Sequence, residues 1–413
     1  MQAAPAESAP INRKSLLFIL VTAFLNLAGI GLLAPVIKFL VEGYVSDPGE
    51  VAIATGLLFT SYSFFQFLAV PTLGALSDRY GRRPILLLCL FGSSLGYLIF
   101  GIGGALWILF LGRIIDGVTG GNIGTIYAYI ADLTPPKERT RYFGLIGAIA
   151  GLGFVFGPAI GGILTRVGGT ATPVFFAALV TFLNVIWGYF AMPESLRPEQ
   201  RMERISLVKL NPFWQLRDVF RIPQLRWLLL ATFLWMTPFA MLQSNLAVLG
   251  SDWLGAREQD IALVFTIIGL IIVIVQGGLI YPLLRFFSES QLTLAGMVLF
   301  AIGFCFYALI PSTRSNGTLL AAVIVLPFGN ALITPTIASL TSQAVGPREQ
   351  GRVQGGSQSV QAFARVIGPT LGGYAYAEIG AASPYVAGVV FLIIAAVCVL
   401  LALPDLRAAM ANS

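Results

Sequence analysis

Long uncharged apolar runs constrain this sequence more than any other feature. A helix needs roughly 20 residues to cross the hydrocarbon core of a bilayer, and that length is reached by residues 15–37, 51–77, 142–165, 167–193, 227–251, 261–284, 290–313 and 379–404. The run 84–112 is too long for one crossing and breaks at Gly101 to Gly104, and further crossings are expected over 105–131, 315–341 and 353–377. Only 11% of the residues are charged. The sequence therefore predicts an all-α membrane protein with twelve transmembrane helices.

The distribution of lysine and arginine predicts the orientation of these helices. Twelve crossings place both termini on one side, and 19 of the 25 basic residues fall on that side. We therefore expect both termini in the cytoplasm and the chain in the cell (inner) membrane. Arg13 and Lys14 precede an apolar run that is too long for a typical signal peptide and lacks a small-residue cleavage site, so we expect a retained first helix. The net charge of +6 reflects this topology and not nucleic-acid binding.

The polar inventory argues against an enzyme. The three cysteines, Cys89, Cys305 and Cys398, lie in separate apolar segments, which favours neither a disulfide framework nor a metal site. Histidine, the commonest metal ligand and general base, is absent from the sequence. We expect no catalytic residues, no metal and no cofactor.

An internal repeat divides the chain into two related halves. At an offset of 211 residues, the second half repeats eight residues of the first half, which are Pro136, Glu138, Arg141, Gly144, Gly157, Pro158, Gly161 and Gly162. Their counterparts are Pro347, Glu349, Arg352, Gly355, Gly368, Pro369, Gly372 and Gly373. Parallel repeats of this kind are typical of transporters in which one bundle rocks against the other. We predict a first bundle over 1–193, a cytoplasmic linker over 194–225 and a second bundle over 226–413.

Three short motifs carry a family resemblance. They are GALSDRYGRRP at 74–84, LGRIIDGVTGG at 111–121 and GLGFVFGPAIGG at 151–162. In these motifs the chain resembles the major facilitator superfamily, and within it the twelve-helix drug:proton antiporters, tetracycline exporters especially. The resemblance implies two pseudo-symmetric six-helix bundles, a monomer, alternating access, and proton-coupled efflux of a small amphipathic drug or metabolite. A metabolite facilitator or importer of the same fold is the alternative, followed by a membrane receptor that no longer transports.

The resemblance implies that the first motif forms a cytoplasmic gate, made of Gly74, Asp78, Arg79, Gly81, Arg82, Arg83 and, from the fourth helix, Asp132. We expect Asp78 to face the positive N-terminal end of the eleventh helix near Arg352, and Arg82 to pair with Asp132. A basic loop that only fixes topology would explain the arginines, but neither Asp78 nor the glycines.

Small residues on the fifth and eleventh helices predict close helix packing. They are Gly153, Gly157, Pro158, Gly161, Gly162, Gly368, Pro369, Gly372 and Gly373. The resemblance adds that this interface between the halves resists proton leak and favours export.

Three ionisable residues fall inside predicted crossings, where charge is costly and functional by default. Arg113 and Asp116 share one face of the fourth helix and are expected to be either a self-neutralised structural pair or the proton-coupling group. The resemblance implies coupling through Arg113. Arg365 has no acidic partner on its own helix, and we expect it to anchor substrate or to pair with Asp116 across the bundles.

Two departures from the tetracycline exporters bear on the substrate. Asn26 and Gly96 stand where those proteins carry aspartates, which argues against tetracycline or a strongly cationic drug. The remaining charges favour a neutral, zwitterionic or anionic substrate. Further cavity residues are expected among polar and aromatic groups near mid-helix, namely Asn26, Tyr62, Gln66, Gln243, Asn330, Gln358 and Gln361.

Overall fold

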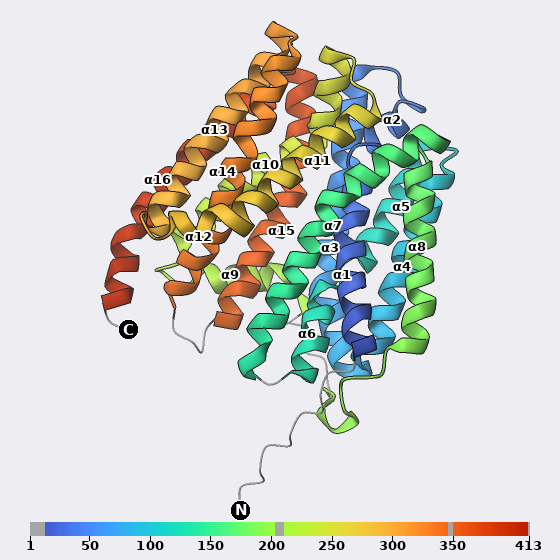
Figure 1. The fold of residues 1–413 in the computed structure, drawn as a ribbon, viewed down its shortest axis with the longest axis vertical. Helices are drawn as coiled ribbons and strands as arrows, with labels where there is room; N and C mark the ends of the chain where they lie inside the picture. The colour runs from blue at the N-terminus through green and yellow to red at the C-terminus, as the bar shows by residue number, and fades with distance from the viewer. Residues whose placement is uncertain (1–12, 135, 203–209, 346–349, 412–413) are drawn as a thin grey trace, which may run out of the picture.

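The computed structural model describes residues 13–134, 136–202, 210–345 and 350–411, and the described residues form helices and connections without any strand. Figure 1 shows the helices gathered into two bundles that stand side by side. The first bundle contains α1 (Arg13–Leu33), α2 (Ile37–Val41), α3 (Pro48–Tyr80), α4 (Arg82–Ile102), α5 (Leu106–Thr119), α6 (Ile123–Leu133), α7 (Pro136–Gly168) and α8 (Thr172–Ala191). The second contains α10 (Arg226–Leu254), α11 (Glu258–Ile274), α12 (Ile280–Leu283), α13 (Glu289–Thr313), α14 (Asn316–Gln343), α15 (Gln350–Tyr374) and α16 (Ser383–Ala411).

The segment between the bundles contributes a short 3-10 helix, η1 (Pro198–Gln200), and α9 (Pro212–Phe220). Two further crossings contain a π-helical turn, η3 (Val275–Leu279) between α11 and α12, and η4 (Ala375–Ile379) after α15. In the described part of the chain, eleven helical segments are long and apolar enough to span a membrane, and α5 with α6 counts as one of them. The remaining long helix, α15, is the predicted eleventh crossing. It is more polar than the others and lies against α10 and α3.

Local sequence signals explain where several helices begin and end. Asp47 caps α3 by accepting a hydrogen bond from the backbone N–H of Glu50 at 2.9 Å. Gly255 ends α10 in the left-handed conformation that glycine adopts without strain. Ser288 and Gln291 form a reciprocal capping box at the start of α13.

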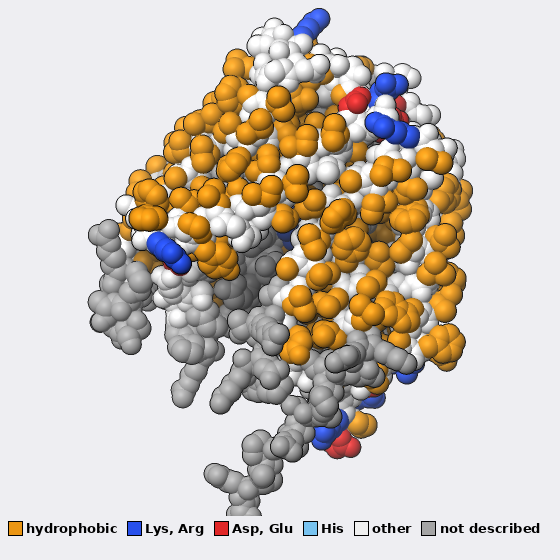
Figure 2. Space-filling model, viewed as in Figure 1, with side chains coloured by type: hydrophobic (Ala, Val, Ile, Leu, Met, Phe, Trp, Pro, Cys, Tyr) orange, Lys and Arg blue, Asp and Glu red, His pale blue; other side chains and the backbone are white. Residues whose placement is uncertain are grey.

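Apolar side chains cover the sides of the molecule, as expected for a protein surrounded by lipid. Figure 2 shows a broad belt of hydrophobic side chains between the upper end, which carries charged groups of both signs, and the charged lower end. Large residues such as Phe190 and Trp107 are exposed on these sides, at 81% and 66% of their surface. We call the upper end in Figures 1 and 2 the Lys38 end and the lower end the Asp78 end.

The two bundles are joined by hydrogen bonds toward the Lys38 end. Thr60 on α3 donates to the carbonyl oxygen of Val366 at 3.0 Å and lies 2.7 Å from the hydroxyl of Thr370, both on α15. Arg166 at the end of α7 donates to Gln259 on α11 at 2.5 Å. Toward the Asp78 end, Figure 2 shows the molecule hollowed between the two bundles.

The small-residue helices occupy equivalent places in the two bundles. Gly153, Gly157 and Gly161 on α7 lie against the backbone of α1, and Pro158 contacts Gly31 on the same helix. On α15, Gly368 and Gly372 lie against α10. The remaining members reach across to the other bundle, with Gly162 against α11 and with Pro369 and Gly373 against α3. Most of these residues therefore pack helices within a bundle, and only part of the set lies at the interface between halves.

Candidate functional site

The fourth crossing is interrupted at Gly120, Gly121 and Asn122, between α5 and α6. Gln66 on α3 donates to the backbone carbonyl of Gly120 at 3.0 Å, which satisfies an acceptor freed by the break. Asn122 accepts a hydrogen bond from the side chain of Asn26 on α1 at 2.7 Å. The sequence predicted one continuous helix over 105–131, so the break is a correction. The adjacent glycines Gly120 and Gly121 were the sequence signal for this break. Irregular backbone at membrane depth occurs only where it lines a cavity or is buried in protein.

The charged pair lies directly before this break. Arg113 is 4% exposed and Asp116 is 2% exposed, and the guanidinium donates to the carboxylate at 3.1 Å. The ring of Tyr62 on α3 lies against the guanidinium, with 4.3 Å between the Arg113 Cζ and the ring centroid. The Nε of Arg113 is buried and has no partner among the described residues. The pair is thus compact and neutral overall, and the buried Nε of Arg113 is left without a hydrogen-bond partner in the described structure.

Arg365 reaches the same region from the second bundle. It interacts electrostatically with Tyr62, which also interacts with Arg113 and Asp116. Within the part of the chain that the structure describes, Arg365 makes no ion pair and no side-chain hydrogen bond. The alternative in which Arg365 pairs with Asp116 is not found, because Asp116 is paired with Arg113. Tyr62 therefore interacts with the charged residues of both halves, Arg113 and Asp116 of the first and Arg365 of the second.

The other predicted cavity residues divide into two groups. Asn26 and Gln66 are engaged in hydrogen bonds between helices, and Asn330 is buried and accepts from Thr334 on its own helix at 3.3 Å. Gln243 and Gln361 are half-buried and Gln358 is exposed, and none of the three has a hydrogen-bond partner among the described side chains. In the described structure the side chains of this second group therefore have unused hydrogen-bonding groups.

Gly96 is a packing position between α4 and α5. A Cβ atom at this residue would lie 2.8 Å from the backbone nitrogen of Asp116 and 2.8 Å from the carbonyl oxygen of Gly112. Real Cβ atoms do not approach backbone atoms so closely, so an aspartate would require the two helices to separate. Glycine at residue 96 is therefore required by the close packing of α4 against α5.

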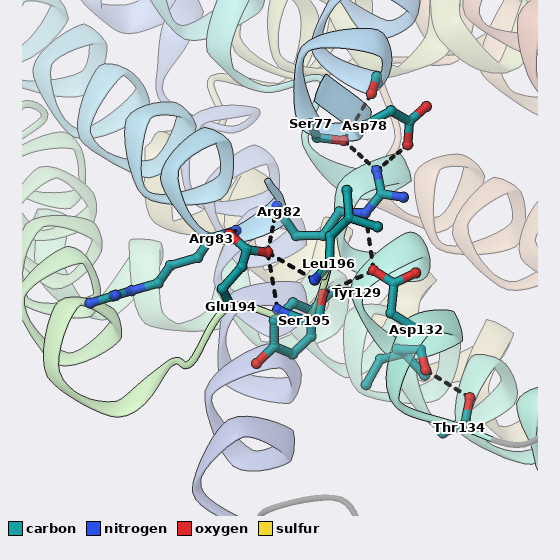
Figure 3. A network of polar contacts seen from close by, with 12 residues as sticks. Ser77, Asp78, Arg82, Arg83, Tyr129, Asp132, Thr134, Glu194, Ser195 and Leu196 are labelled. Carbon is teal, nitrogen blue, oxygen red and sulfur yellow. Dashed lines mark hydrogen bonds and ion pairs between the residues drawn. The ribbon is translucent and has the colours of Figure 1, made fainter. Parts of the chain in front are cut away.

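Figure 3 shows the network around Arg82 at the Asp78 end. The guanidinium of Arg82 donates to Ser77 at 2.8 Å and to Asp132 at 3.2 Å, and it forms an ion pair with Asp78. The structure thus brings Arg82 and Asp132 together across the first bundle. The second expected contact, between Asp78 and the start of α15 near Arg352, involves a side chain outside the described residues. Asp78, near the end of α3, forms an ion pair with Arg82 at the start of α4.

Glu194 is a member of this network that the sequence did not reveal. Its carboxylate accepts from the backbone nitrogens of Arg82 at 2.9 Å and Arg83 at 3.3 Å, and so caps the start of α4 (Figure 3). It also accepts from its own neighbours Ser195 and Leu196. An acidic residue directly after the sixth apolar run was the only signal, and nothing in the sequence linked it to residue 82.

The remaining gate residues have different surroundings. Gly81 has φ +110°, and a Cβ there would also collide with the Glu194 carboxylate, so both backbone and space require glycine. Gly74 faces open space. Arg83 donates to the backbone carbonyl of Tyr189 at 2.5 Å, and exposed Arg79 lies over the ring of Tyr80.

A second charged cluster, at the Lys38 end, was also missed. Lys38 is 1% exposed and is paired with Glu42 and with Asp252 of the other bundle. The sequence signal was a lysine two residues into a short apolar segment, and its partner lies 214 residues away.

The sequence matches the profile of the family described as Major Facilitator Superfamily over residues 19–369, with a second match over 254–413. It is 32% identical over 360 residues to the tetracycline resistance protein of class C from Escherichia coli, which covers 87% of this chain and 89% of that protein. It is 28% identical to Multidrug resistance protein 2 of Bacillus subtilis over 88% of this chain and 89% of that one. The solved structure of the human organic anion transporter MFSD10 has a TM-score of 0.71 at 25% identity, covering 95% of this chain and 100% of that one.

Proposed function

The chain belongs to the Major Facilitator Superfamily, and on that premise we propose that it exports a small amphipathic molecule in exchange for protons by alternating access. The relatives named as tetracycline and multidrug resistance proteins support a transporter of drugs or metabolites. The excess of lysine and arginine at the Asp78 end supports a cytoplasmic location for that end and for both termini. We propose that a single chain is the working unit.

Alternating access is supported by the way the two bundles meet. Their hydrogen bonds at Thr60 and Arg166 close the Lys38 end, while the molecule is hollowed toward the Asp78 end. With the Asp78 end in the cytoplasm, this arrangement is an inward-open state. The equivalent packing of α7 and α15 gives the protein a second, symmetry-related way to close.

Proton coupling is assigned to the Arg113–Asp116 pair. A coupling group must bind a proton from one side of the membrane and release it to the other. Asp116 lies about one turn before the break in the fourth crossing, and Arg113 stabilises its charged form. Protonation of Asp116 would release Arg113, whose Nε already lacks a partner among the described residues. The two protonation states would therefore present different donors to the cavity.

The substrate class is inferred from Arg365, whose positive charge has no protein partner in the described structure. Arg113 and Asp116 neutralise one another, so Arg365 leaves one positive charge facing Tyr62 without a protein partner in the described structure. Arg365 is half-buried, and a guanidinium removed from water without a counter-charge is costly, so a substrate carboxylate or other anionic group would offset that cost. The relative MFSD10 is named as an organic anion transporter. We propose an amphipathic molecule that bears an anionic or zwitterionic group.

The test is substrate-dependent proton movement by the purified protein in liposomes. A panel of matched amphipathic compounds, differing only in an anionic, neutral or cationic group, is added to vesicles that contain a pH-sensitive dye. The proposal predicts proton movement with the anionic or zwitterionic members and little with the cationic ones. Substrate uptake without proton movement would identify a facilitator, and a response to cationic compounds alone would contradict the role of Arg365.

A further inference from the structure

A buried cluster of charges joins the two bundles at the Lys38 end. Lys38 on α2 donates to the hydroxyl of Ser251 at 2.6 Å and forms an ion pair with Asp252 at 3.5 Å. Both acceptors lie near the end of α10, in the other bundle. Lys38 is also paired with Glu42, which lies one helical turn further along its own segment. The lysine is therefore held by one carboxylate from each half.

The partners of Lys38 differ in what happens when the halves separate. Glu42 belongs to the same bundle and moves with Lys38, so the lysine keeps a counter-charge. Asp252 has no second cation among its described partners. It keeps only the hydrogen bond that the hydroxyl of Tyr376 donates at 3.0 Å. That hydroxyl in turn accepts a hydrogen bond from the indole N–H of Trp253 at 3.2 Å. Opening this end therefore leaves the aspartate, and not the lysine, without an ion-pair partner in the described structure.

Asp252 is also within reach of solvent on this side. Its side chain is 20% exposed, whereas that of Lys38 is 2% exposed. It lines a hollow of about 530 Å³ together with Pro48, Gly49, Trp253, Arg314 and Tyr376. A proton from this side of the membrane can therefore reach the carboxylate while the gate is closed.

We propose that Asp252 is a second proton-binding site, which unlocks the gate at the Lys38 end when it is protonated from outside. The proposal rests on the orientation given above, in which the Lys38 end faces outward. Protonation removes the ion pair with Lys38 across the halves and removes the unpaired charge that opening would otherwise create. Proton binding therefore favours the open gate, by the linkage between ligand binding and conformation.

The charged and titratable groups around Asp252 set the sign of this effect. Lys38 opposes protonation in the closed state and is withdrawn in the open state. Tyr376 remains with Asp252 in both states, and Glu42 remains with Lys38. Arg314 shares the hollow and lies over the Trp253 ring at 5.3 Å, on the same side of the gate as Asp252. Because the proton is released to the same side when Lys38 re-pairs, Asp252 biases the gate and adds nothing to the proton stoichiometry of transport.

The test is a distance measured across the Lys38 end as a function of pH. The native cysteines are first replaced by alanine at Cys89, Cys305 and Cys398. Spin labels are then attached to cysteines introduced at Ser46 in the first half and Ser312 in the second half, where both residues are exposed. In the parent protein, lowering the pH should move the population from short to long distances. Asp252→Asn should show the long distance at every pH.

Two variants provide matched controls. Glu42→Gln removes the counter-charge that travels with Lys38, so it should shift the population toward the closed gate and keep a response to pH. Tyr376→Phe keeps every charge but removes the hydrogen bond to the carboxylate, so its response should move to higher pH. Tyr376→Phe also preserves the test if Asp252→Asn does not fold.

Asp116→Asn separates this proposal from the proposed function. The gate should still respond to pH in that variant, because Asp116 takes no part in the cluster at the Lys38 end. A parent protein without a pH response, or a response that survives in Asp252→Asn, would overturn the proposal. Loss of the response in Asp116→Asn would assign pH sensing to Asp116 and overturn it equally.

Discussion

Arg113 and Asp116 lie three residues apart on α5, and the guanidinium of one donates to the carboxylate of the other at 3.1 Å beneath the ring of Tyr62. Both side chains are almost completely buried. Removing one member of such a pair costs about 3–5 kcal/mol when the other charge stays behind. A change that neutralises Asp116 therefore forces Arg113 to find another partner, and this links protonation to a movement in the cavity.

Replacing Arg365 should weaken substrate binding. A hydrogen bond to a charged group contributes about 1.5–3 kcal/mol, so we expect Arg365→Ala to lower affinity by about 10-fold to 100-fold. Arg365→Lys should recover only part of this loss, because lysine keeps the charge but lacks the planar fork. Equilibrium binding of labelled substrate to purified protein checks both variants. Normal binding by an Arg365→Ala protein that is unstable in detergent would make the residue structural.

Replacing Asp78 should slow transport without preventing membrane insertion. Asp78→Asn removes the ion pair with Arg82 but leaves the contacts of Arg82 with Ser77 and Asp132 in place. The charge acts on a conformational equilibrium, so the amount of inserted protein should match the parent while the turnover falls. Arg285→Gln, which neutralises an exposed residue between α12 and α13, is the control and should transport normally. Parental turnover by a well-inserted Asp78→Asn protein would contradict a gating role.

Gly81 and Gly74 should differ sharply in their tolerance of alanine. Gly81→Ala introduces a side chain at φ +110° and against Glu194, so we expect a loss of about 1–3 kcal/mol. Gly74→Ala places a methyl group in open space within α3 and should be neutral or stabilising by about 0.5–1 kcal/mol. Thermal unfolding of both variants in detergent measures the difference. Equal stability of the two proteins would show that the Glu194 network does not hold the loop.

Introducing an aspartate should disrupt folding at Gly96 and be tolerated at Asn26, the two positions where the family resemblance implies an acid. Gly96→Asp forces a side chain against the backbone of α5, so it should lower the folded yield strongly. Asn26→Asp replaces a side chain that already has room, and this variant should insert. Size-exclusion profiles of the two purified proteins compare their folded fractions. A well-folded Gly96→Asp protein would show that α4 and α5 separate easily.

Much of the architecture was predictable because it depends on patterns local to the chain. Hydropathy predicted the crossings, and the repeat around Gly157 and Gly368 predicted the relation between the halves. The spacing of Arg113 and Asp116 on one helix face was enough to expect their contact. Each of these inferences uses neighbouring residues or a motif that occurs twice.

The features that the sequence did not reveal depend on contacts between distant segments. Glu194 caps α4 from 112 residues away, and Asp252 meets Lys38 only once the two bundles are assembled. The break at Gly120 is stabilised by Gln66 of another helix, so helix propensity alone did not place it. Such contacts follow from tertiary packing, which no local pattern encodes.

Transport by Asp116→Asn in proteoliposomes tests whether Asp116 couples protons to export. Asparagine mimics the protonated carboxyl group, so the variant should lose substrate accumulation driven by a pH gradient but retain downhill exchange of labelled for unlabelled substrate. Glu50→Gln, which removes an exposed carboxylate in the first turn of α3, is the control and should retain both activities. We expect Asp116→Asn to lose accumulation and to preserve exchange. Unchanged pH-driven accumulation, or loss of both activities in a folded protein, would contradict the assignment of proton coupling to Asp116.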